Sequence, residues 1–192
     1  MSLGLTVKSL WLKSLLALVW LISLSLYAVD VDGDEVAVGE YHTCAVDDNG
    51  LHCWGDNDHG QINVPTDLVN PVAVSTGGYH TCAIDDNGLQ CWGWNNQGQT
   101  DVPTDLVNPV AVSASLYHNC AIDDNGVHCW GIKNTNSFGQ IDVPTNLINP
   151  VAVSTGGYHT CALDDNGVHC WGYNGYGQTD VPTNLINPVA VS

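Results

Sequence analysis

The segment VAVSTGGYHTCAIDDNGLQCWGWNNQGQTDVPTDLVNP, which runs from Val72 to Pro109, decides the fold because most of the chain repeats it. Variants of this segment occupy residues 36–71, 110–150 and 151–188, and residues 189–192 repeat its beginning. The first cysteine of each copy advances by 38, 38 and 41 residues, through Cys44, Cys82, Cys120 and Cys161. A residue that recurs in every copy is more typical of a repeated structural unit than of a catalytic group.

Each copy has the pattern of short strands separated by turns. In the quoted copy, residues 72–75 are rich in β-branched side chains, and 80–84 and 89–92 flank 85–88, whose Asn-Gly end favours a tight reversal. We therefore expect one strand followed by a hairpin. Residues 100–103 are a candidate for a short fourth strand at a sheet edge, where proline is tolerated.

This pattern predicts an all-β repeat protein, because no helical period follows the N-terminal segment. A unit of about 38 residues cannot bury its faces alone, so copies must stack or close radially. Blades of four strands around an axis form a β-propeller. A flat solenoid is the alternative, but its coils are usually shorter than this repeat.

The N-terminal segment has the layout of a secretory leader, in which a basic start precedes a short apolar helix. Lys8 and Lys13 precede an uncharged run at 14–29, and small residues allow cleavage after Ser25 or Ala28. The run is shorter than the roughly 20 residues that span a bilayer. We expect a signal peptide or N-terminal anchor at 1–28, an acidic linker at 29–35 and a repeat domain at 36–192. The expected location is periplasmic, cell-surface or extracellular.

The chain is strongly acidic, with 20 Asp and Glu against 3 Lys and Arg and a net charge of −17. Loss of the leader would leave Lys133 as the one basic residue against 20 acidic ones, a net charge of −19. Nucleic-acid binding depends on Lys and Arg displacing counterions from phosphates. The composition therefore excludes a nucleic-acid partner, and it disfavours anionic membranes.

The eight cysteines form four C-x8-C pairs, one in each repeat. If residues 47–50 form the hairpin loop, Val46 faces Leu51 and the two cysteines fall opposite each other, within about 5 Å. A bulged turn would offset them by one position. In an oxidising compartment we expect four disulfides: Cys44–Cys53, Cys82–Cys91, Cys120–Cys129 and Cys161–Cys170.

Two patterns resemble metal sites. His42 and His52 lie near the first cysteine pair and suggest a Cys2His2 zinc set, but the second copy has Gln90 in place of His52. Alternating carboxylates after the leader resemble part of a calcium loop: Asp30, Asp32 and Asp34. They lack the downstream bidentate glutamate, so a solvated linker is favoured. We expect no metal and no cofactor, with calcium at these aspartates as the alternative.

The run Tyr-His-Thr-Cys-Ala-x-Asp-Asp-Asn-Gly-x-x-Cys-Trp-Gly, followed by Gly-Gln, resembles the regulator of chromosome condensation (RCC1) repeat in the cysteine-containing form of exported bacterial proteins. The resemblance covers residues 36–188, and in the quoted copy it is carried by His80, Gly88, Trp92, Gly93, Gly98 and Gln99. It implies RCC1-like β-propeller blades, usually seven in a ring, and a scaffold for protein binding. One member of the family is an exchange factor for a small GTPase on chromatin, and another is a secreted β-lactamase inhibitor. Export and acidity argue against guanine-nucleotide exchange here.

Four copies are fewer than seven blades. Residues 189–192 repeat the first strand of a fifth copy, and three explanations remain open. Either this strand completes a closed four-bladed ring, or two chains assemble into one ring, or the sequence is a fragment of a longer one. An open arc or a fragment is favoured, because a leftover strand is an edge that natural proteins normally cover.

Positions that recur in all copies are predicted to be structural. We expect four tryptophans in the blade cores: Trp54, Trp92, Trp130 and Trp171. We expect four histidines to form hydrogen bonds within the strands, since buried polar groups need partners: His42, His80, His118 and His159. The paired Asp85 and Asp86 are predicted to shape the turn rather than to act as acid and base.

Function is expected at positions that differ between copies. The loops between Trp-Gly and Gly-Gln should share one side of the array, and their candidate binding residues are His59, Trp94, Lys133, Phe138, Tyr173 and Tyr176. Aromatic side chains are enriched at binding hot spots, although drift in surface loops is the alternative. We predict an exported, non-enzymatic scaffold that binds another protein and can self-associate to complete a propeller. A secreted enzyme inhibitor or a calcium-assisted structural surface protein are the alternatives.

Overall fold

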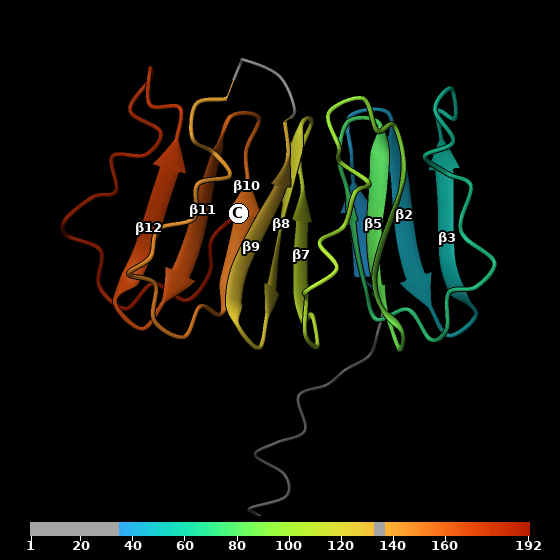
Figure 1. The fold of residues 1–192 in the computed structure, drawn as a ribbon, viewed down its shortest axis with the longest axis horizontal. Coiled ribbons are helices and arrows are strands. Elements are labelled where there is room, and N and C mark those ends of the chain that lie inside the picture. Colours follow the sequence, from blue (N-terminus) through green and yellow to red (C-terminus); the bar gives the residue numbers. More distant parts are fainter. Residues whose placement is uncertain (1–34, 133–136) are drawn as a thin grey trace, which may run out of the picture. The chain divides into compact units, whose positions relative to one another are not determined.

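The computed structural model describes residues 35–132 and 137–192. These residues are all-β and contain four antiparallel sheets of three strands, one sheet per repeat (Figure 1). They belong to one compact unit, Gly33–Ser192. No helix in the described ranges is long and apolar enough to cross a membrane. The predicted leader, the linker aspartates and Lys133 lie outside the described residues.

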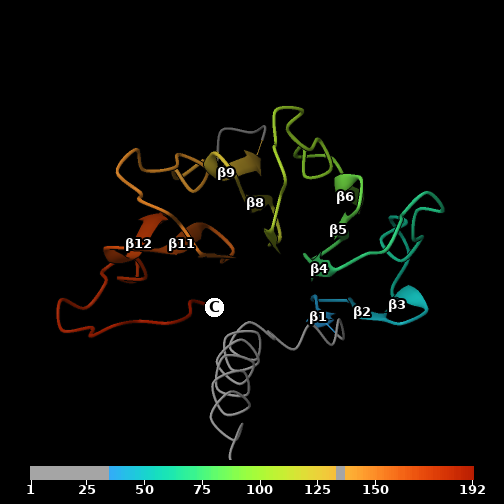
Figure 2. The same cartoon turned by 90° about the horizontal axis from the view of Figure 1, so that it is seen from below.

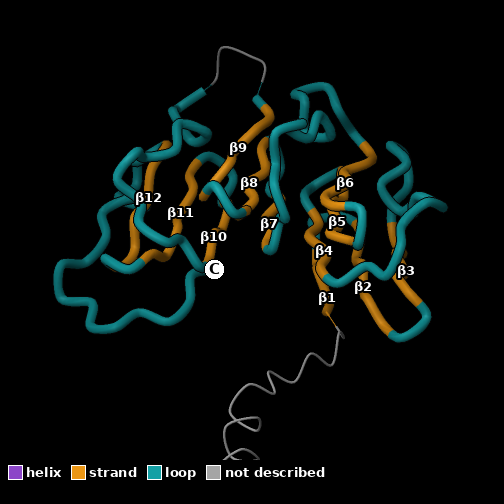
Figure 3. The backbone as a smooth tube through the Cα atoms, turned by 60° about the horizontal axis from the view of Figure 1, so that its bottom comes forward, coloured by secondary structure: helices purple, strands orange, loops and turns teal. Residues whose placement is uncertain are grey.

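In every sheet, which we call a blade, the middle strand pairs with an inner and an outer strand. In chain order the strands are β1 (Glu35–Val38), β2 (His42–Asp47), β3 (Gly50–Gly55), β4 (Ala73–Thr76), β5 (His80–Asp85), β6 (Gly88–Gly93), β7 (Ala111–Ala114), β8 (His118–Asp123), β9 (Gly126–Gly131), β10 (Ala152–Thr155), β11 (His159–Asp164) and β12 (Gly167–Gly172). Long loops connect each outer strand to the next blade (Figure 3).

The predicted hairpin and its disulfide are confirmed. In the second blade Asp85 pairs with Gly88 and Cys82 lies opposite Cys91, so the turn is tight and carries no bulge. Gly88 has a φ of 119°, which L-residues rarely adopt. All four predicted bridges are present, each with a Cα–Cα distance of 4.1 Å. Because the bridges use every cysteine, no Cys2His2 zinc site can form.

The predicted fourth strand is wrong. Residues 100–103 form a turn and irregular chain, because their backbone groups bond inside the preceding loop. The Thr100 N–H donates to Asn95 Oδ1 at 2.9 Å, and the Asp101 N–H donates to the Gly98 carbonyl at 3.2 Å. Residues 189–192 are not a strand either. They join none of the four sheets, each of which consists of the three strands of one repeat, so they complete no four-bladed ring.

The blades fan around a common axis, with inner strands β1, β4, β7 and β10 nearest to it (Figure 2). Successive inner strands contact one another, and the middle strand of each of the first three blades contacts the inner strand of the next. Middle strands β5 and β8 are therefore buried along their whole length, because a blade covers each of their two faces.

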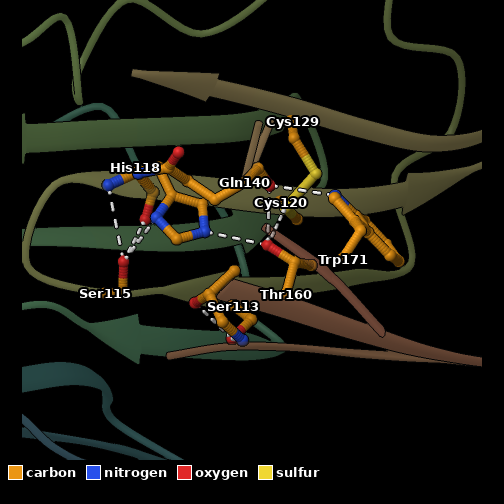
Figure 4. The surroundings of a disulfide bond; sticks show 9 residues. Ser113, Ser115, His118, Cys120, Cys129, Gln140, Thr160 and Trp171 are labelled. Atoms are coloured by element: carbon orange, nitrogen blue, oxygen red, sulfur yellow. Dashed lines mark hydrogen bonds between the residues drawn. A yellow bond between two sulfur atoms is a disulfide. The ribbon is translucent and has the colours of Figure 1, made fainter. Parts of the chain in front are cut away.

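Each blade is joined to the next by a shared set of buried polar contacts. At the third junction, His118 Nε2 lies 2.9 Å from Thr160 Oγ1, and this hydroxyl donates to the Gln140 carbonyl at 2.8 Å (Figure 4). The indole N–H of Trp171 donates to the same carbonyl at 3.0 Å. Because the Thr160 hydroxyl proton is already used, the histidine must donate from Nε2.

The other two junctions repeat this set. At the first junction the residues are His42, Thr81, Gln61 and Trp92, and at the second they are His80, Asn119, Gln99 and Trp130. The prediction of structural hydrogen bonds is confirmed for His42, His80 and His118, although the bonds join neighbouring blades rather than strands of one blade. It is not confirmed for His159, whose ring has no hydrogen-bond partner among the described residues.

The prediction that every tryptophan lies in the core is wrong for Trp54. Its side chain is 53% exposed, against 7% for Trp130 and 8% for Trp171. The reason is positional. A tryptophan is covered by the Gly-Gln segment of the preceding repeat, and the described chain has no blade before the first one.

The aspartate pairs shape the turns, as predicted. They also bind the segment that leads from the preceding repeat into the blade. Asp85 Oδ1 accepts the Asn87 N–H at 2.8 Å, and its Oδ2 accepts the Val69 N–H at 2.8 Å. Asp86 Oδ2 accepts the Asn70 side-chain amide at 2.6 Å. Asn70 has a φ of 51°, in the left-handed region, so these contacts hold a sharp bend where the chain enters the blade.

Candidate functional site

The variable loops gather at one end of the blades, opposite the Asn-Gly turns. The hairpin register places the start of each middle strand beside the end of each outer strand, as in the pair His80 and Gly93. A tyrosine stands just before every middle strand, and a variable loop follows every outer strand. We call this surface the aromatic rim, defined by Tyr41, His59, Tyr79, Trp94, Tyr117, Phe138, Tyr158, Tyr173 and Tyr176.

The first two blades contribute one aromatic cluster to the rim. Tyr41 and Tyr79 stack, with ring centroids 4.9 Å apart. His59 and Trp94 approach Tyr79 from the loops, at 5.2 Å and 5.9 Å, and lie 6.1 Å from each other. Residues from both loops therefore join one surface centred on Tyr79.

The last two blades contribute a second cluster. Tyr117 and Tyr158 are 5.5 Å apart, and Phe138 meets Tyr158 at 5.6 Å and Tyr173 at 4.8 Å. Tyr176 lies 6.0 Å from Tyr173 and is 90% exposed. An exposed aromatic side chain held at the edge of a packed cluster is a typical anchor for a partner surface.

Hydrogen bonds and glycines fix the loop that carries Trp94. Asn95 holds the loop closed: its side-chain amide donates to Asp101 Oδ1 at 2.7 Å, and its carbonyl oxygen accepts the Thr100 N–H. Gly93 has a φ of 104°, and a Cβ there would lie 2.7 Å from the Tyr79 carbonyl. The loops of the first and fourth repeats have the same closing asparagine, at Asn57 and Asn174.

Two tyrosines of the rim, Tyr79 and Tyr117, have raised pKa values. A hydrogen bond with Tyr41 raises the pKa of Tyr79 to about 12, and burial and the negative charges of Glu40 and Asp56 also raise it. A hydrogen bond with Tyr158 raises the pKa of Tyr117 in the same way. These phenols therefore stay protonated at physiological pH, in an acidic setting that attracts cationic groups.

The structure brings the predicted binding residues together in two groups. His59 and Trp94 meet in the first cluster, while Phe138, Tyr173 and Tyr176 meet in the second. Sequence reasoning missed the four tyrosines because they recur in every copy and were assigned to the structural motif: Tyr41, Tyr79, Tyr117 and Tyr158. Their position before each middle strand, at the loop end of the predicted hairpin, was the available signal.

The described ranges contain no group of three or more His, Cys, Asp or Glu placed to hold a metal ion. The calcium candidates Asp30, Asp32 and Asp34 lie outside them. The groups that the rim presents are aromatic faces, the protonated phenols of Tyr79 and Tyr117 and nearby carboxylates.

Comparison with known proteins connects these repeats to a family. The family model described as the regulator of chromosome condensation (RCC1) repeat matches residues 34–61, 72–99, 110–140 and 151–178. No curated protein matches the chain.

Several solved structures share the fold. The CRINKLY WD40 ectodomain of the Arabidopsis thaliana receptor kinase ACR4 is 27% identical, with a TM-score of 0.59 over 71% of this chain and 49% of that one. The ectodomain of the Physcomitrella patens receptor kinase CR4 is 26% identical, with a TM-score of 0.59 over 71% and 38%. Prp20p of Saccharomyces cerevisiae is 17% identical, with a TM-score of 0.61 over 73% and 45%. The chain thus spans less than half the length of each of these proteins.

Proposed function

Because the chain belongs to the RCC1 repeat family, we propose that it is an exported, non-enzymatic scaffold that binds another protein through the aromatic rim. The aromatic clusters are the observation that carries this proposal. Tyrosines that recur in every repeat form the centres of the clusters, and the loops that differ between repeats supply the other members. The recurring histidines, in contrast, join the blades. A repeat protein acquires a specific binding surface when its loops vary in sequence while the contacts between its repeats are kept.

The surroundings of the rim favour a basic partner. Glu40 and Asp56 lie close enough to Tyr79 to raise its pKa, and the whole chain has a net charge of −17. Arginine and lysine side chains are attracted to the faces of Trp and Tyr rings, and nearby carboxylates attract the same cations. We therefore propose a protein surface rich in these cations as the partner. It would be attracted by the overall field and anchored by the rings.

Two comparisons support parts of this proposal. The plant structures are receptor ectodomains, and the four disulfides here are typical of a non-reducing, extracellular environment. Prp20p has binding properties towards Gsp1p and histones, so one protein of this fold has protein partners. We do not extend nucleotide exchange to this chain, because export would separate it from cytosolic GTPases.

The proposal can be tested by quantitative capture from the exported fraction of the producing cell. We expect the wild-type chain to retain a protein that Trp94→Ala and Tyr176→Ala chains retain at least about tenfold less, since truncated aromatic anchors lose most of their binding energy. Val110→Ala is the matched control. Val110 is also exposed, but its N–H bonds to the Ile122 carbonyl at the opposite end of the blade.

Folding must be followed in the same samples. Unchanged unfolding midpoints together with equal capture by all variants would contradict rim binding. Release by 0.5 M salt, followed by identification of the retained protein, tests whether the partner is basic, because screening at that ionic strength weakens exposed charge pairs.

A further inference from the structure

A hollow of about 370 Å³ lies at the rim end of the inner strands, and all four described blades contribute to its wall. Each blade supplies the last residue of its inner strand and the two residues that follow: 38–40, 76–78, 114–116 and 155–157. Because the inner strands lie nearest to the common axis (Figure 2), we call this space the axial hollow. Its volume is within the range of sites that bind small ligands or single side chains.

The residue just before each rim tyrosine gives the axial hollow its chemical character. In the four copies this residue is Glu40, Gly78, Leu116 and Gly157, so the position varies although the strand and the tyrosine around it recur. The other residues of the wall are glycine, alanine, valine, serine and threonine. Among the described residues that line the hollow, Glu40 is therefore the one charged group.

Two of these side chains converge on a glycine between them. A Cβ built at Gly78 would lie 2.4 Å from Leu116 Cδ1 and 3.7 Å from Glu40 Oε2. Gly78 belongs to the second blade, while Glu40 and Leu116 come from the blades on either side of it. The absence of a side chain at Gly78 therefore lets a carboxylate and an apolar side chain share one concave surface.

The Glu40 carboxylate is available to a ligand. The residue is exposed, and the described part of the chain supplies it with neither a hydrogen bond nor a salt bridge. The turn aspartates differ in this respect. Asp123, for example, accepts the N–H groups of Val107 and Asn125 at 2.7 Å each. Both oxygens of Glu40 can therefore accept hydrogen bonds from a bound group.

Glu40 also lies near both aromatic clusters. The pKa of Tyr79 is raised mainly by its hydrogen bond with Tyr41, and that of Tyr117 mainly by its hydrogen bond with Tyr158, but the negative charge of Glu40 contributes to both. Tyr79 is the centre of the first cluster, and Tyr117 belongs to the second. A cation bound to Glu40 would therefore lie where the two clusters approach each other.

A guanidinium group matches these surroundings better than other charged groups do. It can donate two parallel hydrogen bonds to a carboxylate, and its planar face packs on aromatic and apolar surfaces. The methylene stem of an arginine can lie along an apolar side chain. An ammonium is more strongly hydrated and has no planar face, and an anion would be repelled by the net charge of −17.

We propose that the axial hollow binds an arginine side chain of the basic protein partner, with the guanidinium on Glu40 and the methylene stem against Leu116. This inference rests on the proposed function, because the partner supplies the arginine. It adds to that function a site outside the loops that carry Trp94 and Tyr176.

The site can be tested directly with N-acetyl-arginine methylamide, titrated into the full-length, oxidised chain and followed by NMR. We expect saturable shifts of the Gly77, Gly78 and Leu116 amide signals. The citrulline derivative, which has a similar shape but no charge, should bind at least about fivefold more weakly, as should the arginine probe to Glu40→Gln. Asp58→Asn is the matched control, because Asp58 is an exposed rim-loop carboxylate and its substitution changes the net charge equally. Equal binding by the two variants, or no saturable shift in the wild type, overturns the proposal.

Capture of the protein partner separates this site from the proposed function. We expect Glu40→Gln to retain about fivefold less partner than Asp58→Asn does, with unchanged unfolding midpoints because both residues are exposed. If Trp94→Ala loses the partner while Glu40→Gln and Asp58→Asn retain it equally, the rim binds the partner and the arginine site is wrong. If no partner is captured by the wild type, the proposed function fails, and selective probe binding at Glu40 would still support a guanidinium site.

Discussion

Trp171 donates its indole N–H to the main-chain oxygen of Gln140, which lies 31 residues earlier and in the preceding blade. The bond is 3.0 Å long and buried, and the same oxygen accepts the hydroxyl of Thr160. The conspicuous Trp-Gly and Gly-Gln pairs of the repeat are therefore two halves of one contact between blades.

Removing the indole N–H should weaken this junction. We expect Trp171→Phe to lower the free energy of unfolding by about 1–2 kcal/mol, because the ring still packs but a buried hydrogen bond is lost. Chemical denaturation followed by circular dichroism measures the change. Trp54→Phe is the matched control, because the described residues offer the Trp54 indole N–H no acceptor. This substitution should change the free energy of unfolding by less than about 0.5 kcal/mol. Equal losses in the two variants would contradict the role assigned to the Gln140 carbonyl.

Acid should destabilise the array through its junction histidines. Burial lowers the pKa of His80 and of His118 from 6.5 to about 4. Between these values the unfolded chain binds protons that the folded chain does not, so stability present above about pH 6.5 is lost as the pH falls towards 4. The full difference corresponds to about 3 kcal/mol for each histidine.

This pH dependence can be separated from that of the carboxylates. His118→Gln should unfold more easily at pH 7 but lose less further stability between pH 7 and pH 4 than the wild type does, because one buried titrating group is gone. Urea denaturation across this range measures both slopes. Parallel slopes would show that other groups cause the acid sensitivity.

Each disulfide should contribute separately to stability. The bridges join cysteines nine positions apart, and a ring of this size adds roughly 2–3 kcal/mol in the chain-entropy model. We expect Cys120→Ala/Cys129→Ala to lose about this amount in non-reducing denaturation. Thiol labelling of the unfolded wild type without reductant should detect no free cysteine, and labelled cysteines would show that the bridges are incomplete.

Gly93→Ala should cost more than Gly88→Ala. Both glycines have left-handed backbones, with φ values of 104° and 119°, so each substitution introduces strain of about 1–3 kcal/mol. Only at Gly93 would the new Cβ meet a backbone atom, the Tyr79 carbonyl at 2.7 Å; at Gly88 there is nothing within 4 Å. The difference between their unfolding free energies measures the close contact at the foot of the Trp94 loop.

The sequence predicted the structure of a single blade more completely than the contacts between blades. Asn87-Gly88 and the alternation of the flanking strands are local signals, and they suffice for the hairpin and for the pairing of Cys82 with Cys91. The contacts between blades join residues 20 to 42 positions apart, as in His118 and Thr160. No local pattern shows which copy faces which, so the exposed position of Trp54 was missed.

The candidate site was only partly predictable for a related reason. Differences between copies point to Trp94 and Phe138, but they hide Tyr79 and Tyr158, which recur in every repeat and yet lie at the centres of the clusters. The prediction of a fourth strand was wrong because the Asn95 side chain accepts the Thr100 N–H, which in a strand would donate to a neighbouring strand.

The acceptor at each junction is a main-chain oxygen, which every amino acid possesses. The chain between Gly131 and Gln140 is three residues longer than its counterparts, yet Gln140 receives Trp171 and Thr160 at the same distances as Gln61 receives the equivalent residues of the second blade. The three additional residues of this loop therefore leave the hydrogen bonds between the blades unchanged. An engineer could graft peptide sequences between Trp-Gly and Gly-Gln of any repeat while leaving the joints between blades unaltered.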